Sequence, residues 1–323
     1  MLTMFLYLFL FLVLYSITKH FLNRFRNLPP SPFPALPILG HLYLLRKPYH
    51  RSLAKLSARY GPVVLLDFGS RPVLVVSSPS AAEECLATND VAFANRPRLL
   101  AGRHLGFNYT SIVYASYGPH WRNLRRISTV EILSSARLQA LSHVRADEAR
   151  SLVRRLARLG LQDQTADMKT ILFETMANVM MRMLVGKRCY GGVSGTAEEG
   201  KQIQEIVSEA HRLGSTTYVS DFVPVLGRVW DRGYEKSLNE LQRKRVRFMQ
   251  SLIDDEKREM ARSVPNINIE EKKKNMIDVL FTLQESEPQY YTDEIIRGFM
   301  LVCISQYSLN YLRAIILIIK SNA

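Results

Sequence analysis

The feature that most constrains this chain is its first stretch, because residues 1–17 carry no charged side chain and consist mainly of Leu, Phe, Met, Val and Tyr. As a helix this stretch would be roughly 26 Å long at about 1.5 Å per residue, which is close to the hydrocarbon thickness of a bilayer. Phe21 and Leu22 extend the apolar surface. The sequence therefore predicts a transmembrane anchor over residues 1–22.

The charges that follow the apolar stretch predict its orientation. Lys19, Arg24 and Arg26 come after it, and no basic residue precedes it. Basic residues favour the cytoplasmic side of a membrane, so the rest of the chain is expected in the cytosol. A cleaved signal peptide is the competing interpretation. It would need a basic start and a small-residue cleavage site, and residues 15–19 offer neither cleanly.

A proline-rich segment, residues 28–41, follows the predicted anchor. Proline fixes φ and favours extended backbone, so we expect this segment to be a stiff hinge. The apolar residues between its prolines favour packing against the following domain over display as an SH3-type ligand.

Behind the hinge, helical periodicity dominates and a hairpin is predicted. Residues 63–68 and 72–77 are rich in β-branched side chains and flank Gly69-Ser70-Arg71, which is typical of a turn. The apolar spacing predicts helices over residues 48–60, 80–87, 119–130, 141–159, 168–185, 203–213, 238–252, 276–283 and 293–302. The expected fold class is mainly α with a small β-sheet.

Three local patterns refine these expectations. Ser80 and Glu83 have the spacing of a capping box at the start of a helix. Gly160 is expected to end the helix that begins near Leu141, because glycine is favoured just past a helix C-terminus. Residues 98–116 have no clear period, which predicts a long loop, and long loops are often binding elements.

Composition and charge exclude several functional classes. The chain has 323 residues, 47% of them hydrophobic, and a net charge of +14 from 43 Lys and Arg against 29 Asp and Glu. Such a charge suits an anionic membrane or an acidic protein partner. Motifs of nucleic-acid-binding folds do not accompany it, so no nucleic-acid partner is expected. Hydrolase and P-loop signatures are also absent.

The cysteines argue against a disulfide scaffold and against structural zinc. There are three, Cys85, Cys189 and Cys303, and none forms a C-x-x-C pair. An odd count without paired spacing is typical of a reducing compartment. We expect each thiol to pack in the core and to bind no metal.

The stretch from Tyr117 to Arg126 concentrates aromatic and cationic side chains just after a turn. Pro119 suits the first turn of a helix, where its missing N–H is no loss. Trp121 and Arg125 lie four residues apart and so share a helix face. An indole N–H beside a guanidinium can grip a carboxylate on a planar ligand. A basic surface helix with one half-buried Trp is the structural alternative.

The order of an apolar anchor, a proline-rich hinge, Phe93-Ala-Asn-Arg-Pro97 and Trp121-x-x-x-Arg125 resembles the microsomal cytochrome P450 family, of the plant A-type, isoflavone-hydroxylase-like kind. The resemblance runs from residue 1 to about residue 302. It implies the amino-terminal portion of the cytochrome P450 fold, with a partial domain over residues 42–302. It also implies that Trp121 and Arg125 hold the haem propionates, with His120 as a third candidate.

The resemblance stops after residue 302. The family's Ala-Gly-Thr-Asp/Glu-Thr kink, its Glu-x-x-Arg helix and its Phe-x-x-Gly-x-Arg-x-Cys-x-Gly loop are not found in these residues, and residues 303–323 form an off-family tail. We therefore expect a truncated haem-thiolate monooxygenase. Because the oxygen-binding Thr and the haem Cys are missing, this chain is expected to have no catalytic residue of its own, to lack stable thiolate-ligated haem and to be inactive.

The resemblance also implies partners and a location. Complete members sit in the endoplasmic reticulum membrane through one N-terminal anchor, with a cytosolic body. They take electrons from an NADPH-dependent cytochrome reductase and hydroxylate small lipophilic metabolites, flavonoid-like or otherwise specialised. The alternative function is a membrane-bound regulatory or binding protein that competes for a reductase or another partner.

Overall fold

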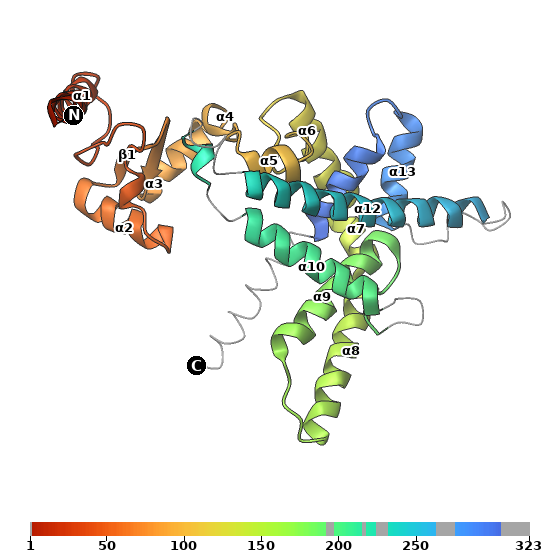
Figure 1. Cartoon of the computed structure of the whole chain (residues 1–323). Coiled ribbons are helices and arrows are strands. Elements are labelled where there is room, and N and C mark those ends of the chain that lie inside the picture. Colours follow the sequence, from red (N-terminus) through yellow and green to blue (C-terminus); the bar gives the residue numbers. More distant parts are fainter. Residues whose placement is uncertain (1, 192–196, 215–217, 224–231, 263–274, 305–323) are drawn as a thin grey trace. The chain divides into compact units, whose positions relative to one another are not determined.

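In the computed structural model the chain divides into two compact units. Figure 1 labels their helices and strands. Unit 1 comprises residues 1–97 and 217–235, and unit 2 comprises residues 98–216 and 236–323. The described residues are mainly helical and form one two-stranded sheet, which confirms the expected class. The residues that the structure describes are 2–191, 197–214, 218–223, 232–262 and 275–304.

Unit 1 holds the hairpin and a set of mostly short helices. Its elements are α1 (Leu2–Phe25), the 3-10 turn η1 (Leu42–Leu44), α2 (Tyr49–Tyr60), β1 (Val63–Phe68), β2 (Arg71–Val76), α3 (Pro79–Glu83), the π-helical turn η2 (Glu84–Thr88), α4 (Asp90–Phe93) and the 3-10 turn η4 (Val219–Asp221).

In the described part of unit 2 the regular secondary structure is all helical. Its elements are α5 (Leu100–Leu105), α6 (Pro119–Arg126), the π-helical turn η3 (Ile127–Ile132), α7 (Ser135–Ala140), α8 (Ser142–Leu161), α9 (Met168–Val185), α10 (Ala197–Gly214), α12 (Arg232–Arg262) from residue 236 onward, α13 (Met276–Ser286) and a helix over residues 293–304.

The predicted hairpin is confirmed. β1 pairs with β2 in an antiparallel register that runs from Val63 opposite Val76 to Phe68 opposite Arg71. Gly69 occupies the turn with φ of +59°, a left-handed conformation that favours glycine.

The proline-rich segment is fastened to β1 through His41, which is fully buried. The backbone N–H of Asp67 donates to Nδ1 of His41 (2.8 Å), so the ring proton lies on Nε2 and is donated to the carbonyl of Pro32 (2.7 Å). The N–H of Leu65 also donates to the carbonyl of Pro30 (2.9 Å). The predicted packing of this segment against the following strands is confirmed within unit 1.

The apolar start of the chain is helical, as predicted. α1 includes exposed aromatic side chains such as Phe11 and Phe25, which are 64% and 81% exposed. None of the helices in the described residues combines the length and the apolar character that crossing a membrane requires. The anchor over residues 1–22 therefore stays a prediction.

The predicted capping box at Ser80 and Glu83 is wrong. The helix begins two residues earlier, because Ser78 is the N-cap and its side chain accepts a hydrogen bond from the N–H of Ala81 (3.3 Å). Pro79 then occupies the first helical position, where a missing N–H is tolerated.

The core of unit 2 is built around α9. Its predicted limits are confirmed, since Asp167 caps its N-terminus and Gly186 follows its last residue with φ of +73°. The methionine-rich face of α9 is buried, with Met180 and Met183 at 2% and 0% exposure. Packing in the core accounts for the methionines of this face.

α8 packs along α9 and is slightly longer than predicted. It passes through Gly160 and ends at Leu161, where Gln162 follows as its C-cap. The stop expected at Gly160 is therefore wrong by two residues, because the last turn is closed by backbone hydrogen bonds from Gln162.

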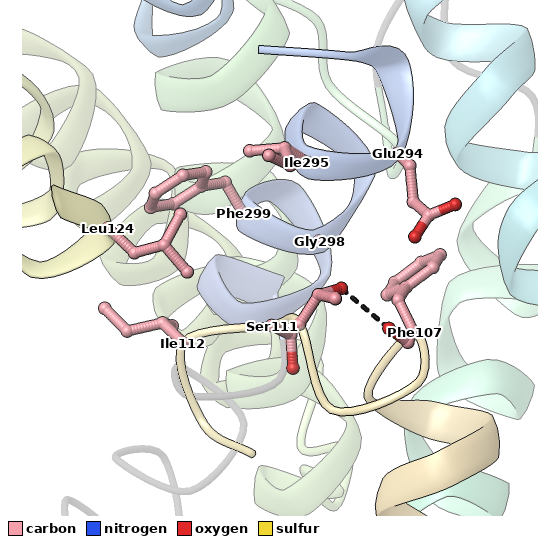
Figure 2. Close-up of a pocket in the computed structure, with 9 residues that line it drawn as sticks. Phe107, Ser111, Ile112, Leu124, Glu294, Ile295, Gly298 and Phe299 are labelled. Atoms are coloured by element: carbon pink, nitrogen blue, oxygen red, sulfur yellow. Dashed lines mark hydrogen bonds between the residues drawn. The ribbon is translucent and has the colours of Figure 1, made fainter. Parts of the chain in front are cut away.

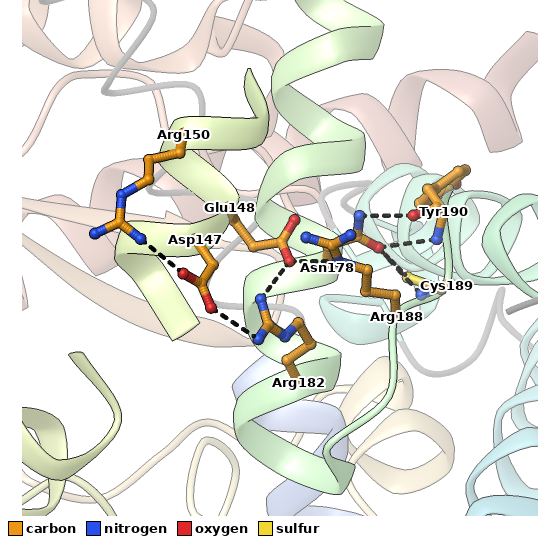
Figure 3. Close-up of polar contacts among 8 residues, drawn as sticks. All are labelled: Asp147, Glu148, Arg150, Asn178, Arg182, Arg188, Cys189 and Tyr190. Atoms are coloured by element: carbon orange, nitrogen blue, oxygen red, sulfur yellow. Dashed lines mark hydrogen bonds and ion pairs between the residues drawn. The ribbon is translucent and has the colours of Figure 1, made fainter. Parts of the chain in front are cut away.

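A charged cluster joins α8, α9 and the segment after α9 (Figure 3). Glu148 is 2% exposed, and its Oε1 accepts from Arg182 Nη1 and Arg188 Nε, both at 2.7 Å. Asp147 accepts from Arg182 (3.3 Å) and from the more exposed Arg150 (2.9 Å). Ion pairing thus compensates the buried carboxylate of Glu148.

Beside this cluster, Asn178 fixes the segment that follows α9 (Figure 3). Its Oδ1 accepts from the N–H groups of Cys189 (3.1 Å) and Tyr190 (2.8 Å), and its Nδ2 donates to the carbonyl of Tyr190 (2.9 Å). One amide therefore satisfies three backbone groups.

The off-family tail predicted over residues 303–323 falls, from residue 305 onward, outside the described residues.

Candidate functional site

α6 begins and ends as its sequence requires. Gly118 is its N-cap and Pro119 occupies the first turn. Leu124 is buried at 2% exposure and faces the core, while Trp121 is half-buried and Arg125 is exposed. The continuation predicted to residue 130 is present, but it takes the form of the π-helical turn η3.

The aromatic and cationic side chains of α6 lie together. The guanidinium carbon of Arg125 is 5.7 Å from the ring centroid of Trp121. Tyr117 packs on the other side, with ring centroids 5.7 Å apart from Trp121, and Arg122 lies 5.9 Å from the Tyr117 ring. The sequence-predicted pair is thus brought together on one face, in a cation–π arrangement. We call Tyr117, Trp121, Arg122 and Arg125 the cationic face.

Among the described residues, no carboxylate pairs with the charges of this face. Neither Arg122 nor Arg125 forms an ion pair with any carboxylate in the described part of the chain. The guanidinium of Arg125 therefore keeps its fork of N–H donors available for an anion. With the indole N–H of Trp121 beside it, the face can hold a carboxylate group of a bound molecule.

His120, the third predicted site residue, has a different environment. Its Nδ1 lies 2.7 Å from the hydroxyl of Tyr290, and its Nε2 lies 2.8 Å from the carbonyl oxygen of Thr110. Both ring nitrogens are therefore occupied by groups of this chain. A contact between His120 and a carboxylate ligand would have to replace one of these hydrogen bonds.

The long loop predicted over residues 98–116 is partly helical. It contains α5, which is too short to give a readable period and buries Ala101 and Leu105. After α5 the backbone turns through three consecutive left-handed residues, Phe107, Asn108 and Tyr109, with φ of 50°, 51° and 65°. Side chains other than glycine disfavour this conformation by about 1–2 kcal/mol each, so the surroundings must hold the turn in place.

A pocket lies between this turn, α6 and the helix over residues 293–304. Figure 2 shows Phe107, Ser111 and Ile112 on a loop that lies against the helix carrying Ile295 and Phe299. Among the described residues it is a shallow depression, with about 10 Å³ of room for water-sized groups, and it opens to solvent. Its lining is mainly apolar and consists of Phe107, Thr110, Ser111, Ile112, Leu124, Glu294, Ile295, Gly298 and Phe299.

Comparison with known protein families identifies the family of this chain. A family model described as Cytochrome P450 matches residues 29–304, which is most of the chain. The chain belongs to the cytochrome P450 family. This confirms the resemblance on which the site residues were predicted.

Curated relatives narrow the family to plant enzymes. Cytochrome P450 81Q32 of Catharanthus roseus is 43% identical over 303 residues, which are 93% of this chain and 58% of that protein. Isoflavone 3'-hydroxylase of Medicago truncatula is 41% identical over 292 residues, 88% of this chain and 56% of that protein. Isoflavone 2'-hydroxylase of Glycyrrhiza echinata is 39% identical over 305 residues, 92% of this chain and 58% of that protein.

The chain thus spans somewhat more than half the length of the curated relatives it matches. None of these three proteins is described as a regulatory or partner-competing protein. The alternative function given in the sequence analysis therefore gains no support from them.

The P450 family implies haem, and its requirements can be compared with the residues present. Haem carries two propionate carboxylates, and the cationic face offers Arg125 and the Trp121 indole for them. A haem-thiolate protein also needs a deprotonated cysteine. Burial raises the pKa of the Cys189 thiol to about 12 and likewise that of Cys303 to about 12. Cys85 lies in unit 1, on η2. The described residues fit the propionates but not the axial ligand.

The sequence missed the residues that hold α6 to its neighbours. Asn123 donates to the hydroxyl of Tyr291 (3.1 Å), and His120 pairs with Tyr290. Tyr291 is 1% exposed, so its hydroxyl needs a partner inside the protein. The adjacent tyrosines Tyr290 and Tyr291, just before the helix over residues 293–304, were the one sequence signal that could have indicated these contacts. Nothing in the sequence names partners about 170 positions away.

Proposed function

We propose that these residues form the propionate-binding face and part of the ligand pocket of a haem-dependent monooxygenase. The observation that carries the proposal is the pairing of Trp121 with Arg125 on one helix of a P450-family chain. The guanidinium of Arg125 pairs with no carboxylate among the described residues. Haem, when bound, supplies the activation of dioxygen. The residues described below bind and orient the reacting partners.

The roles of the chain's own residues follow from their positions. Arg125 offers two parallel N–H groups to one carboxylate, and the indole N–H of Trp121 adds a further donor. Leu124 turns toward the pocket from the same helix. The cofactor face and the ligand wall therefore share one rigid element, which keeps them in a constant relation.

We propose a small, flat, largely apolar substrate with few polar groups, such as a flavonoid. Two observations support this class. Aromatic and branched side chains line most of the pocket, while Thr110, Ser111 and Glu294 supply its few polar groups. Two of the relatives are named isoflavone hydroxylases.

We further propose a single anchor over residues 1–22 in the endoplasmic reticulum membrane, a cytosolic body, and electrons from an NADPH-dependent cytochrome reductase. The apolar first part of α1, residues 2–17, and the basic residues Lys19, Arg24 and Arg26 that follow this part support the anchor and its orientation. Alkaline extraction of membranes from cells that express the chain with and without residues 1–22 tests this. Release of the full chain into the soluble fraction would count against the anchor.

We also infer that these 323 residues, produced on their own, do not give thiolate-ligated haem or turnover. The sequence contains no Phe-x-x-Gly-x-Arg-x-Cys-x-Gly loop. The thiols of Cys189 and Cys303 are held protonated by burial. Both thiols are protonated before any metal binds, so neither cysteine supplies a preformed thiolate in place of the missing loop.

Titration of the purified chain with haem tests the proposal. We expect saturable binding that the double variant W121A/R125A weakens strongly. The spectrum of the reduced carbon monoxide complex should lack the Soret shift that thiolate ligation produces. Binding that is indifferent to the double variant would refute the propionate site. A thiolate-type spectrum would refute the inference about the axial ligand and leave the site intact.

A further inference from the structure

We propose that His120 is a positioning residue, which fixes the turn over residues 107–112 and thereby sets the shape of the ligand pocket, and that it is not a propionate ligand. The inference rests on the proposed function, because only a ligand pocket gives the position of this turn a role in substrate selection. Three independent features carry it: the hydrogen bonds of His120, its place on α6, and the backbone of the turn.

The hydrogen bonds of His120 define a single neutral tautomer. The carbonyl oxygen of Thr110 can only accept, so Nε2 of His120 carries the proton and donates it (2.8 Å). In the neutral ring Nδ1 is then an acceptor, and the Tyr290 hydroxyl donates a hydrogen bond to it (2.7 Å). The imidazole is fully satisfied between two elements that are distant in the sequence.

These contacts join the walls of the pocket. Thr110 lines the pocket from the turn, and Tyr290 lies just before the helix over residues 293–304, which lines it from the opposite side. His120 itself lies one helical turn before Leu124, the residue through which α6 lines the pocket. One side chain therefore holds all three walls in register.

The position of His120 on α6 separates it from the cationic face. Successive residues of an α-helix are rotated by about 100°, so His120 shares a face with Leu124, whereas Trp121 and Arg125 point elsewhere. A group held by Trp121 and Arg125 would not meet a nitrogen of the imidazole without replacing one of its two hydrogen bonds. The geometry thus assigns the two faces of α6 to different tasks.

The backbone of the turn explains why such a fastening is needed. Phe107, Asn108 and Tyr109 are all left-handed, and Thr110 follows them directly. Non-glycine residues leave this conformation unless tertiary contacts hold them. The hydrogen bond from His120 to the Thr110 carbonyl restrains the end of the turn, and the Tyr109 hydroxyl restrains its middle by donating to the carbonyl of Leu99 (3.1 Å).

Paired substitutions of His120 separate its two hydrogen bonds. In H120Q the amide can still donate to Thr110, whereas in H120N it can still accept from Tyr290 but no longer reaches Thr110. Hydrogen exchange of the amides in residues 106–112 of the full chain is the readout. We expect H120N and H120F to exchange at least about five-fold faster there, and H120Q to stay near the wild type.

Amides of α9 serve as the internal control, because a general loss of stability would accelerate exchange there as well. Equal acceleration in α9 and in the turn, or no difference between H120N and H120Q, would overturn the proposal. Where H120F does not fold, the H120N and H120Q pair decides by itself. Y290F provides a further check, since it removes one hydroxyl and should accelerate the turn less than H120N does.

Haem titration of the same variants distinguishes this inference from the proposed function. We expect H120N to bind haem within about two-fold of the wild type while R125A binds more weakly. Weakened haem binding in H120N with an unchanged turn would make His120 a propionate ligand and overturn the inference. If R125A binds haem normally, the propionate site fails, while the exchange result for the turn still stands on its own.

Discussion

The two arginine clusters of unit 2 have opposite surroundings. Between α8 and α9, Arg182 and Arg188 converge on the buried carboxylate of Glu148. On α6, Arg122 and Arg125 lie over aromatic rings and pair with no carboxylate in the described part of the chain. Arginine thus forms a buried ion pair within the fold between α8 and α9, whereas on α6 its guanidinium can still bind an anion.

The difference teaches how structural and binding charges can be told apart. A buried ion pair leaves an uncompensated charge when one partner is removed, so its loss appears in folding stability. An exposed guanidinium without a partner loses little in folding, and its removal appears in ligand affinity. Each cluster should therefore respond in a different measurement.

The largest effect is expected at the buried ion-pair cluster around Glu148. E148A removes the shared acceptor of Arg182 and Arg188, although Arg182 keeps Asp147, so it should lower the free energy of unfolding by about 2–3 kcal/mol. Urea denaturation measures this loss. E148Q keeps an acceptor oxygen at the same place and should cost less than E148A. Equal stability of E148A and the wild type would remove the distinction between the two clusters.

The next effect belongs to the cationic face. R125A should weaken haem binding roughly 10- to 100-fold, because a charge-assisted hydrogen bond contributes about 1.5–3 kcal/mol. R125K keeps the charge but not the planar fork, so its affinity should fall between the two. The free energy of unfolding should change by less than about 0.5 kcal/mol. R154A, an exposed arginine on α8, is the matched control and should leave haem affinity unchanged.

A third charge, at the start of the pocket helix, tests the comparison by pH. Burial acts to raise the pKa of Asp293, but hydrogen bonds from Lys257, Gln284 and Gln250 outweigh it and lower the pKa to about 2. A carboxylate with a lowered folded-state pKa stabilises the fold above its ordinary value of 3.8, and this stabilisation is lost as the pH falls toward 2.

The stability of the wild type relative to D293N should therefore be greatest above about pH 4 and should shrink by on the order of 1–2 kcal/mol as the pH falls to about 2. Urea denaturation of both proteins across this range measures the difference. A constant difference would mean that Asp293 does not titrate in this window. Asp293 would then be comparable neither with the ion-paired residues around Glu148 nor with the arginines of α6.

The smallest effect is expected at the exposed edge of the ion-pair cluster around Glu148. Arg150 pairs with Asp147 at 2.9 Å, but their side chains are 66% and 42% exposed. Water and salt screen such a pair, so R150A should change the free energy of unfolding by less than about 0.5 kcal/mol. A loss comparable to that of E148A would show that burial is not what separates these ion pairs.

The sequence predicted well whatever depends on neighbours in the chain. Pro119 and Gly186 mark real helix limits, and Gly69 marks the hairpin turn, because each acts through its own backbone preference. The cap at Ser78 was missed even though the signal was present. Pro79, directly after it, suits the first position of a helix better than any residue near Ser80 does.

Contacts between distant segments were beyond prediction. Trp121 and Arg125 could be paired because their spacing places them on one helix face. The partners of His120 and Glu148 lie on other elements, and only the packing of those elements brings them within reach. The pocket depends on the same packing, so its lining could not be read from the periodicity of any single helix.

The π-helical turn η3 gives the direction of the cationic face an unusual sensitivity. Ile127 and Ile132 are five residues apart and both buried, at 0% and 2% exposure, which an ordinary α-helix would not allow on one side. Deleting one residue from this turn would restore regular winding and rotate everything before it by about 100° about the helix axis. A deletion within η3, which alters no side chain of α6, would thus change the direction in which the side chain of Arg125 points.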